Sequence, residues 1–83
     1  MKEACDLHRQ VLEARVRVLG LTHPHTSVAA SNLWHALTDL NEVKAGLEVV
    51  RDYLVWLLKV DPNQLGEQQR RIRQSVLDLF RRT

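Results

Sequence analysis

Residues that interrupt helices divide this chain into four segments, and this division limits the fold more than any other feature. The 83 residues include only three glycines and two prolines. Gly20 and Pro24 follow the first segment, and Pro62 separates the third from the fourth. Glycine readily takes the left-handed conformation that ends a helix, and proline removes a backbone donor and clashes with the preceding turn. Asn41, which tolerates the left-handed conformation, separates the second segment from the third.

Within the first two segments, apolar residues recur at spacings of three and four, which is typical of one helix face. In the first segment these residues are Ala4, Leu7, Val11, Ala14, Val18 and Leu19. In the second they are Ala29, Leu33, Ala36, Leu37 and Leu40, and we expect Thr26 or Ser27 to cap this helix. No segment shows the sustained alternation of a β-strand.

The last two segments differ in character. The third is apolar around its circumference, above all in the run Tyr53–Leu58, so we expect it to be covered on more than one side. The fourth is polar apart from Ile72, Val76, Leu79 and Phe80, as a terminal capping helix requires. The sequence therefore predicts an all-α chain of about four antiparallel helices at 2–19, 26–40, 43–60 and 66–82.

Comparison of the chain with itself indicates a repeat. A shift of 42 places Leu7 on Val49 and Leu12 on Leu54, and a shift of 39 places Leu33 on Ile72. A helix pair that recurs at about 40 residues is the mark of a short α-solenoid.

The segment from 11 to 37 resembles a known family. Leu19-Gly20, His23-Pro24-His25-Thr26 and Asn32-Leu33 are similar to the longer tetratricopeptide repeat of kinesin light chains and many bacterial multi-repeat proteins. The resemblance covers about residues 3–58 and fades beyond Asp61. Trp34 departs from it, because the family keeps a small residue there. Since Gly46 lies on the facing helix, we predict that the Trp34 ring packs against Gly46.

The resemblance implies a scaffold that binds a peptide or protein on a groove lined by the first helix of each pair. Asn32 matches the asparagine of that groove, whose amide both donates and accepts hydrogen bonds. The positions that the resemblance and the repeat assign to the groove are Val28, Ser31, Asn32, His35, Thr38, Asp39, Arg70, Arg71 and Gln74.

The resemblance also implies that 2–19 is the second helix of an incomplete repeat, that 26–60 is one full repeat and that 66–82 is a terminal cap, all in a single domain. The chain is then a fragment of a longer array, or another copy or partner covers the first helix. An isolated chain is therefore expected to self-associate or to stack on neighbouring repeats. The expected apolar interface consists of Leu7, Val11, Val18, Val55, Trp56 and Leu58.

Charge and composition limit the classes of partner that this chain could bind. The net charge is only +2, but residues 44–83 carry eight basic and five acidic side chains, against four and five in residues 1–43. This excess gives the last helix either a solvated surface or a surface for an acidic peptide. Nucleic acid is a distant alternative, because no aromatic residues interleave with the arginines. The apolar run of six residues is too short to span a membrane.

The sequence contains few residues in arrangements that could catalyse a reaction or bind a metal or cofactor. The single cysteine, Cys5, permits no intrachain disulfide and favours the cytoplasm. The four histidines have no recognised ligand spacing, and neither a phosphate loop nor a paired acid is visible. We therefore expect no enzyme activity, no metal and no cofactor. Two functions remain: a partner-binding repeat module, and a self-associating structural segment of a larger repeat protein.

Overall fold

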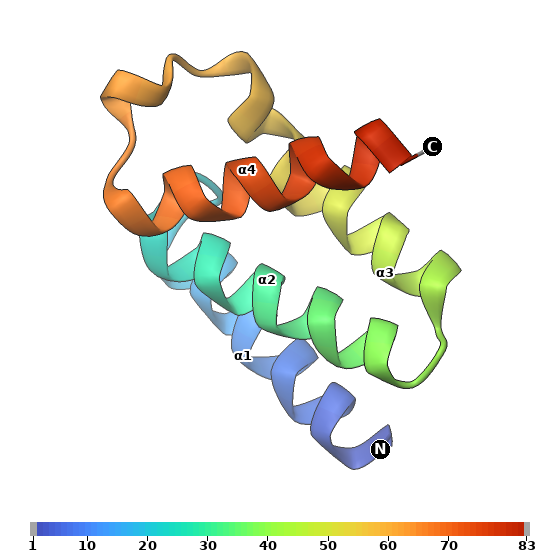
Figure 1. The fold of residues 1–83 in the computed structure, drawn as a ribbon. Helices are drawn as coiled ribbons and strands as arrows, with labels where there is room; N and C mark the ends of the chain where they lie inside the picture. Colours follow the sequence, from blue (N-terminus) through green and yellow to red (C-terminus); the bar gives the residue numbers. More distant parts are fainter. Residues whose placement is uncertain (1, 83) are drawn as a thin grey trace.

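The computed structural model describes residues 2–82, with side chains placed for residues 5–81. It contains four α-helices: α1 (Lys2–Leu19), α2 (Pro24–Asp39), α3 (Val43–Val49) and α4 (Glu67–Arg82) (Figure 1). No strand occurs within residues 2–82. The predicted all-α fold, with helices joined into a short solenoid-like arrangement, is confirmed.

The third helix is not one regular α-helix over 43–60, as the sequence predicted. It changes to a π turn at Val50–Leu54 and then to a 3₁₀ helix at Val55–Lys59. In the π turn the N–H of Val55 donates to the carbonyl of Val50, five residues back. Val50, Leu54 and Leu57 are all fully buried. The irregular geometry falls on these residues, so we attribute it to packing that overrides local helix periodicity.

Two turn residues behave as the sequence predicted. Gly20 has φ 91° and Asn41 has φ 63°, and both values lie in the left-handed region. A third connection, between the 3₁₀ helix and α4, contains the short 3₁₀ turn Pro62–Gln64. Asp61 caps this turn by accepting from the N–H of Asn63 at 2.9 Å.

The start of α2 corrects the prediction of a helix from residue 26 capped by Thr26 or Ser27. The cap is His23, whose Nδ1 accepts from the N–H of His25 at 3.0 Å. Pro24 occupies the first helical position, where its missing N–H has no helical partner to lose. The Thr26 hydroxyl instead donates to the carbonyl of Gly20 at 2.7 Å and closes the turn between α1 and α2.

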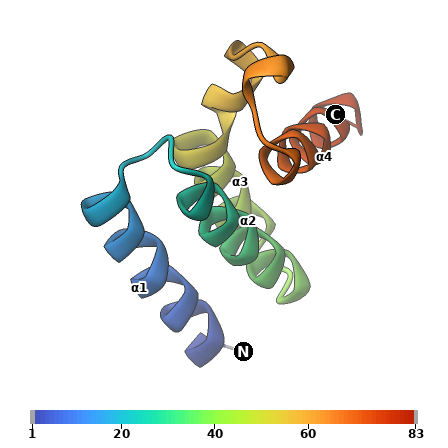
Figure 2. The same ribbon diagram turned by 90° about the vertical axis from the view of Figure 1, so that its left-hand side faces the viewer.

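The helix α2 lies at the centre of the molecule and contacts α1, α3 and α4 (Figure 2). Successive helices α1, α2 and α3 run antiparallel, and α4 crosses above α2 and α3 (Figure 1). The helix α1 packs almost entirely on α2. The molecule measures 36 × 34 × 18 Å, so it is a thin slab in which each helix keeps a solvent-facing side.

The buried face of α1 differs from the one that the spacing of its apolar residues suggested. Leu12 is 1% exposed and Cys5 is also buried, whereas Leu7 is 61% and Val18 is 77% exposed. The row containing Leu7, Val11 and Val18 therefore lies outside the core. This helix carries two apolar rows, and the Cys5–Leu12 row is the one that faces the core.

The inner residues of α2 and α4 were largely predicted. Ala29, Leu33 and Leu37 of α2 are buried. In α4, Ile72 and Val76 are buried, Leu79 is half-buried and Phe80 is 48% exposed. Among the residues that the structure describes, no helix has the length and apolar character needed to cross a membrane.

The predicted contact between Trp34 and Gly46 is confirmed. A Cβ atom added to Gly46 would lie 3.2 Å from Cδ1 of the Trp34 ring. Both residues are buried, and the Thr38 hydroxyl donates to the Trp34 carbonyl at 3.0 Å beside them. The absence of a side chain at residue 46 therefore leaves the space that the indole occupies between α2 and α3.

Candidate functional site

The face of α2 opposite the core carries most of the predicted groove residues. Val28, Ser31, Asn32, His35, Thr38 and Asp39 are spaced at three and four along this helix, and each is exposed or half-buried. The buried residues Ala30, Leu33 and Leu37 lie on the other side. A regular α-helix places the first set on one solvent-facing stripe between α1 and α4.

Three adjoining hollows follow this stripe. The first, the basic hollow, has a volume of about 220 Å³ and lies between α1, α2 and the first turn of α4. It is lined by His8, Val11, Arg15, His25, Val28, Ala29, Asn32 and Gln68. The second, the middle hollow, measures about 190 Å³ and shares three of these residues. It is lined by Val28, Ser31, Asn32, Gln68, Arg71 and Ile72.

The third, the apolar hollow, lies one turn further along both α2 and α4. Its volume is about 310 Å³, and it is lined by Trp34, His35, Thr38, Val43, Leu47, Ser75, Asp78 and Leu79. His35 follows Ser31 by one turn of α2, and Ser75 follows Arg71 by one turn of α4. The three hollows therefore follow one another along α2 and α4, and we call this row of hollows the groove; its first end lies toward α1.

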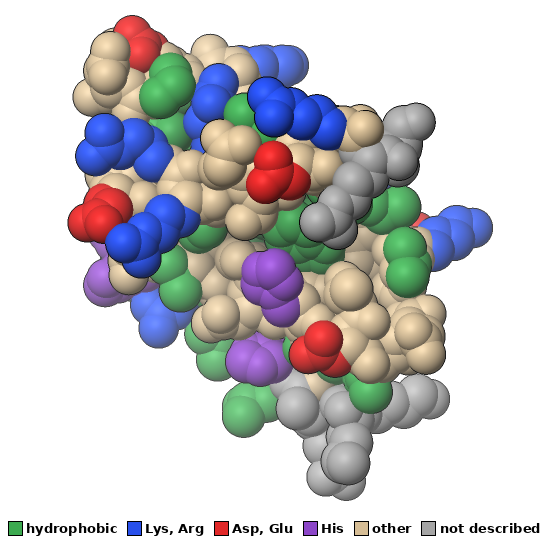
Figure 3. All heavy atoms as spheres, in the orientation of Figure 1, with side chains coloured by type: hydrophobic (Ala, Val, Ile, Leu, Met, Phe, Trp, Pro, Cys, Tyr) green, Lys and Arg blue, Asp and Glu red, His purple; other side chains and the backbone are tan. Residues whose placement is uncertain are grey.

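The polarity of the groove changes along its length. Figure 3 shows hydrophobic side chains at the bottom of a recess between α4 and α2, with histidines beside it. The His35 ring stacks on the Trp34 indole, with centroids 4.9 Å apart and planes 18° apart. Asp78, which accepts from Nε2 of Gln74 at 3.1 Å, supplies a carboxylate to the lining of the apolar hollow. Arginine and histidine side chains line the other two hollows.

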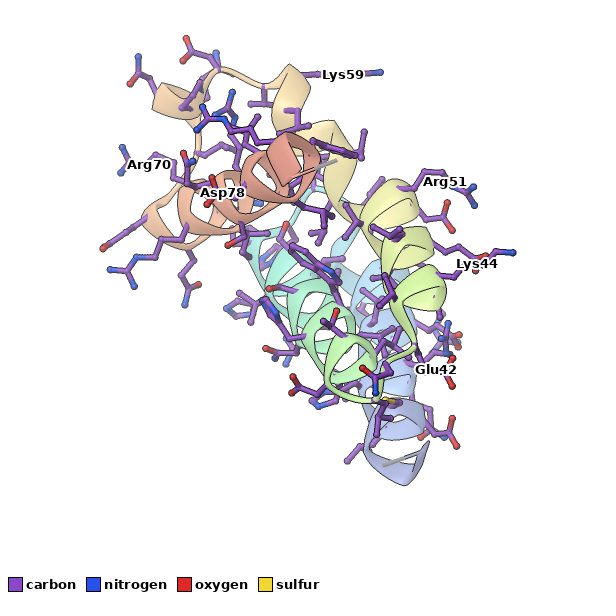
Figure 4. The ribbon with its side chains drawn as sticks, turned by 45° about the vertical axis from the view of Figure 1, so that its right-hand side comes forward. Glu42, Lys44, Arg51, Lys59, Arg70 and Asp78 are labelled. Atoms are coloured by element: carbon purple, nitrogen blue, oxygen red, sulfur yellow. The ribbon has the colours of Figure 1, made fainter. Side chains whose placement is uncertain are left out.

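The predicted α4 residues divide between two faces of that helix. Arg71 lines the middle hollow and pairs with Glu67, with Nη2 and Oε1 2.7 Å apart. Arg70 and Gln74 are exposed and line none of the three hollows, and Figure 4 shows Arg70 pointing away from the helices. Asp39 of α2 is also exposed outside the hollows.

Several lining residues were not predicted from the sequence: His8, Arg15, His25, Val43, Leu47, Gln68, Ser75 and Leu79. The α1 residues His8 and Arg15 were missed because the wrong face of α1 was assigned to the core. Val11, predicted as an interface residue, lines the basic hollow. A search for polar residues three and four apart on α4 would have found Gln68, Arg71 and Ser75 together.

The predicted apolar interface forms two separate areas. On α1, Leu7, Val11 and Val18 are exposed in one row. In the 3₁₀ helix, Val55, Trp56 and Leu58 are half-buried and pack against the core. The indole N–H of Trp56 donates to the Tyr53 carbonyl at 2.8 Å. Of these two areas, the α1 row is therefore the more exposed.

Within the described residues, no three His, Cys, Asp or Glu side chains gather in a way that could hold a metal ion. No family model, no curated protein and no solved structure matches this chain. Because no match assigns a function, the function proposed below is inferred from the residues of the groove.

Proposed function

We propose that this chain is a protein–protein interaction module that binds an extended peptide segment of a partner in the groove between α2 and α4. The observation that carries this proposal is the succession of three hollows along the same two helices. Two of them share Val28, Asn32 and Gln68, and the third follows one turn further along the same two helices. A groove of this kind accommodates a run of consecutive side chains, where a single pocket accommodates one small ligand.

The chemistry of the lining suits a polypeptide. The exposed Asn32 amide lies where two hollows meet, and it can donate to and accept from a peptide backbone. Trp34, Val43, Leu47 and Leu79 offer an apolar surface for an anchoring side chain. Arg15 and Arg71 line the other end of the groove, which favours a partner with acidic residues at that end.

The resemblance to the tetratricopeptide repeat supports the same function. In that family the first helix of each pair lines the binding surface, and the resemblance assigns that position to α2. The resemblance also implies that Trp34 and Gly46, which are in contact here, stand where the family brings its two helices closest. We propose that the module acts by binding alone, without catalysis, in a reducing cytoplasm in which Cys5 remains a thiol.

Selection of a random peptide library displayed on phage tests this function. Selected peptides should bind the chain, and Asn32→Ala should weaken their binding about tenfold, the usual effect of losing one hydrogen-bonding partner. Asn63→Ala is the matched control, because Asn63 is exposed on the 3₁₀ turn outside the groove. Binding that the two substitutions affect equally would exclude the groove.

The second candidate function is self-association through α1, as a structural segment of a larger assembly. The exposure of Leu7 and Val18, at 61% and 77%, favours it. Large apolar side chains arranged in one row on a helix are costly to leave in water. Sedimentation across concentration tests this second candidate, and peptide selection tests the first, because peptide binding in the groove does not require a second copy.

A further inference from the structure

The lining of the basic hollow is unusual in its combination of side chains. His8 and Arg15 project from α1, and His25 projects from α2. The amides of Asn32 and Gln68 complete the polar part of its wall. No carboxylate lines this hollow among the described side chains. Every polar group in the wall can therefore donate a hydrogen bond to an anion, and three of them are cationic or can become so.

The charged groups around the hollow leave its charge largely uncompensated. Arg15 is half-buried and makes no hydrogen bond or ion pair with any side chain that the structure describes. His23 lies beside His25, with ring centroids 4.9 Å apart, and its Nδ1 is occupied as the α2 cap. Arg71, in the adjoining middle hollow, is paired with Glu67 of α4.

We propose that the basic hollow is an anion subsite that binds one carboxylate or phosphate group of a partner, and that His8 and His25 donate hydrogen bonds to this group beside Arg15. The proposal rests on the proposed function, since it assigns the acidic part of the bound peptide to this end of the groove. It adds a specific site and a ligand class.

The two kinds of basic residue have different roles. The planar guanidinium of Arg15 keeps its charge at all physiological pH values and can donate two parallel hydrogen bonds to an oxyanion. Each imidazole of His8 and His25 carries a ring N–H that can donate to the same oxyanion. The hollow therefore offers one fixed positive charge and two further donors around a volume of about 220 Å³.

Titration with sulfate, followed by NMR, tests the subsite without any knowledge of the partner. Sulfate keeps both negative charges between pH 5.5 and 7.5, so a change in affinity reports on the protein. The expected result is a set of chemical-shift changes at the side chains of His8, Arg15, His25 and Asn32.

Three variants separate the roles of these residues. Arg15→Gln should abolish sulfate binding at pH 7.5. His8→Ala combined with His25→Ala should weaken sulfate binding, because two donors to the oxyanion are lost. The α2 cap survives this change, because it uses only the backbone N–H of His25. Arg70→Gln is the matched control, since Arg70 is exposed outside the groove, and circular dichroism verifies folding.

The sulfate experiment tests the anion subsite independently of the peptide-binding groove. If sulfate shifts no residue of the hollow, or if Arg15→Gln and Arg70→Gln weaken sulfate binding equally, the subsite is wrong. Selected peptides would still establish the groove. If sulfate binds as expected but no peptide is selected, the proposed function fails and the anion site stands. If sulfate binds in the hollow and peptides are also selected, a selected peptide is compared in three versions that carry Glu, phosphoserine or Ala at the residue facing the hollow. The tighter of the first two shows which anion is preferred. Equal binding of the Ala version would overturn the assignment.

Discussion

The indole of Trp34 and the bare backbone of Gly46 show how a single pair of residues sets the distance between α2 and α3. A large side chain on one helix requires a small one opposite, because a packed interior has little room for added volume. This pair was predicted because Trp34 stands where the resembled family keeps a small residue, and Gly46 lies on the next helix. The predicted packing is present, with Cδ1 3.2 Å from the position of a Cβ on Gly46.

Replacing Gly46 with leucine should therefore destabilise the protein. The added side chain would meet the Trp34 ring and force α2 and α3 apart, at a cost of roughly 1–3 kcal/mol of unfolding free energy. This loss should outweigh the gain of about 1 kcal/mol in helix propensity. Urea denaturation measures the change.

Gly66→Leu provides the control for this substitution. A Cβ at Gly66 has no atom within 4 Å, and its φ is not in the left-handed region. Gly66→Leu should leave the unfolding free energy unchanged or slightly higher. An increase in stability from Gly46→Leu would mean that the indole does not occupy the space beside residue 46.

At the scale of the helices, one buried side chain fastens α4 to the turn between α1 and α2. Gln69 is 5% exposed, and its Nε2 donates to the carbonyl of Thr22 and to Oγ of Ser27, both at 3.1 Å. These bonds join residues 47 and 42 positions apart in the chain. The first turn of α4 is thereby held over the start of α2, where the basic and middle hollows meet.

Gln69→Glu should consequently loosen α4. A carboxylate has no N–H to donate, so the substitution would place a negative charge against the Thr22 carbonyl and Ser27 Oγ. We expect a loss of at least about 1–3 kcal/mol at neutral pH. Gln68→Glu is the matched control on the neighbouring, exposed position, and it should change stability by less than about 0.5 kcal/mol. Equal effects of the two substitutions in thermal or urea unfolding would show that the Gln69 bonds do not hold α4.

The sequence predicted the number and approximate limits of the helices but not every detail of them. Helix type followed from spacing and from breakers at Gly20 and Asn41, which act locally. The cap of α2 was assigned to the hydroxyls of residues 26 and 27, because histidine is not among the usual capping residues. The side chain of His23 reaches the free N–H only because Pro24 starts the helix.

The orientation of α1 and the groove that depends on it required the structure. This helix has one apolar row through Cys5 and Leu12 and another through Leu7 and Val18. Periodicity alone does not decide which row faces α2, since that choice depends on the rest of the fold. The groove residues of α2 were placed by the family resemblance, whereas those of α1 came only from the three-dimensional arrangement.

For the molecule as a whole, the thin shape and the exposed α1 row predict association. The slab is only 18 Å thick in one direction, so a helix at its edge has few neighbours. Leu7 and Val18 lie on such an edge and are strongly exposed. Burial of apolar surface stabilises an interface by about 25 cal/mol per Å², so pairing of two copies through α1 is favourable.

We therefore expect the chain to sediment as a concentration-dependent oligomer at micromolar concentration. The double substitution Leu7→Glu and Val18→Glu should yield a monomer with unchanged helix content, because neither side chain belongs to the core. Val43→Glu, which places the same charge on an exposed apolar residue of α3, should leave association intact. Wild-type protein that stays monomeric at every concentration would rule out self-association.

The π turn at Val50–Leu54 has a further consequence, which concerns the tolerance of this chain to insertions and deletions. A π turn holds one residue more than an α-helical turn would, and each residue advances a helix by about 100°. Deleting a residue here would restore regular bonding but would rotate everything that follows. Leu57 would leave the core, and its carbonyl would lose the 3.2 Å bond from Nε of Arg73 on α4. The contacts with α4 therefore fix the number of residues in this helix. A loop would tolerate an insertion or deletion, but the same change in the middle of this helix should destabilise the protein.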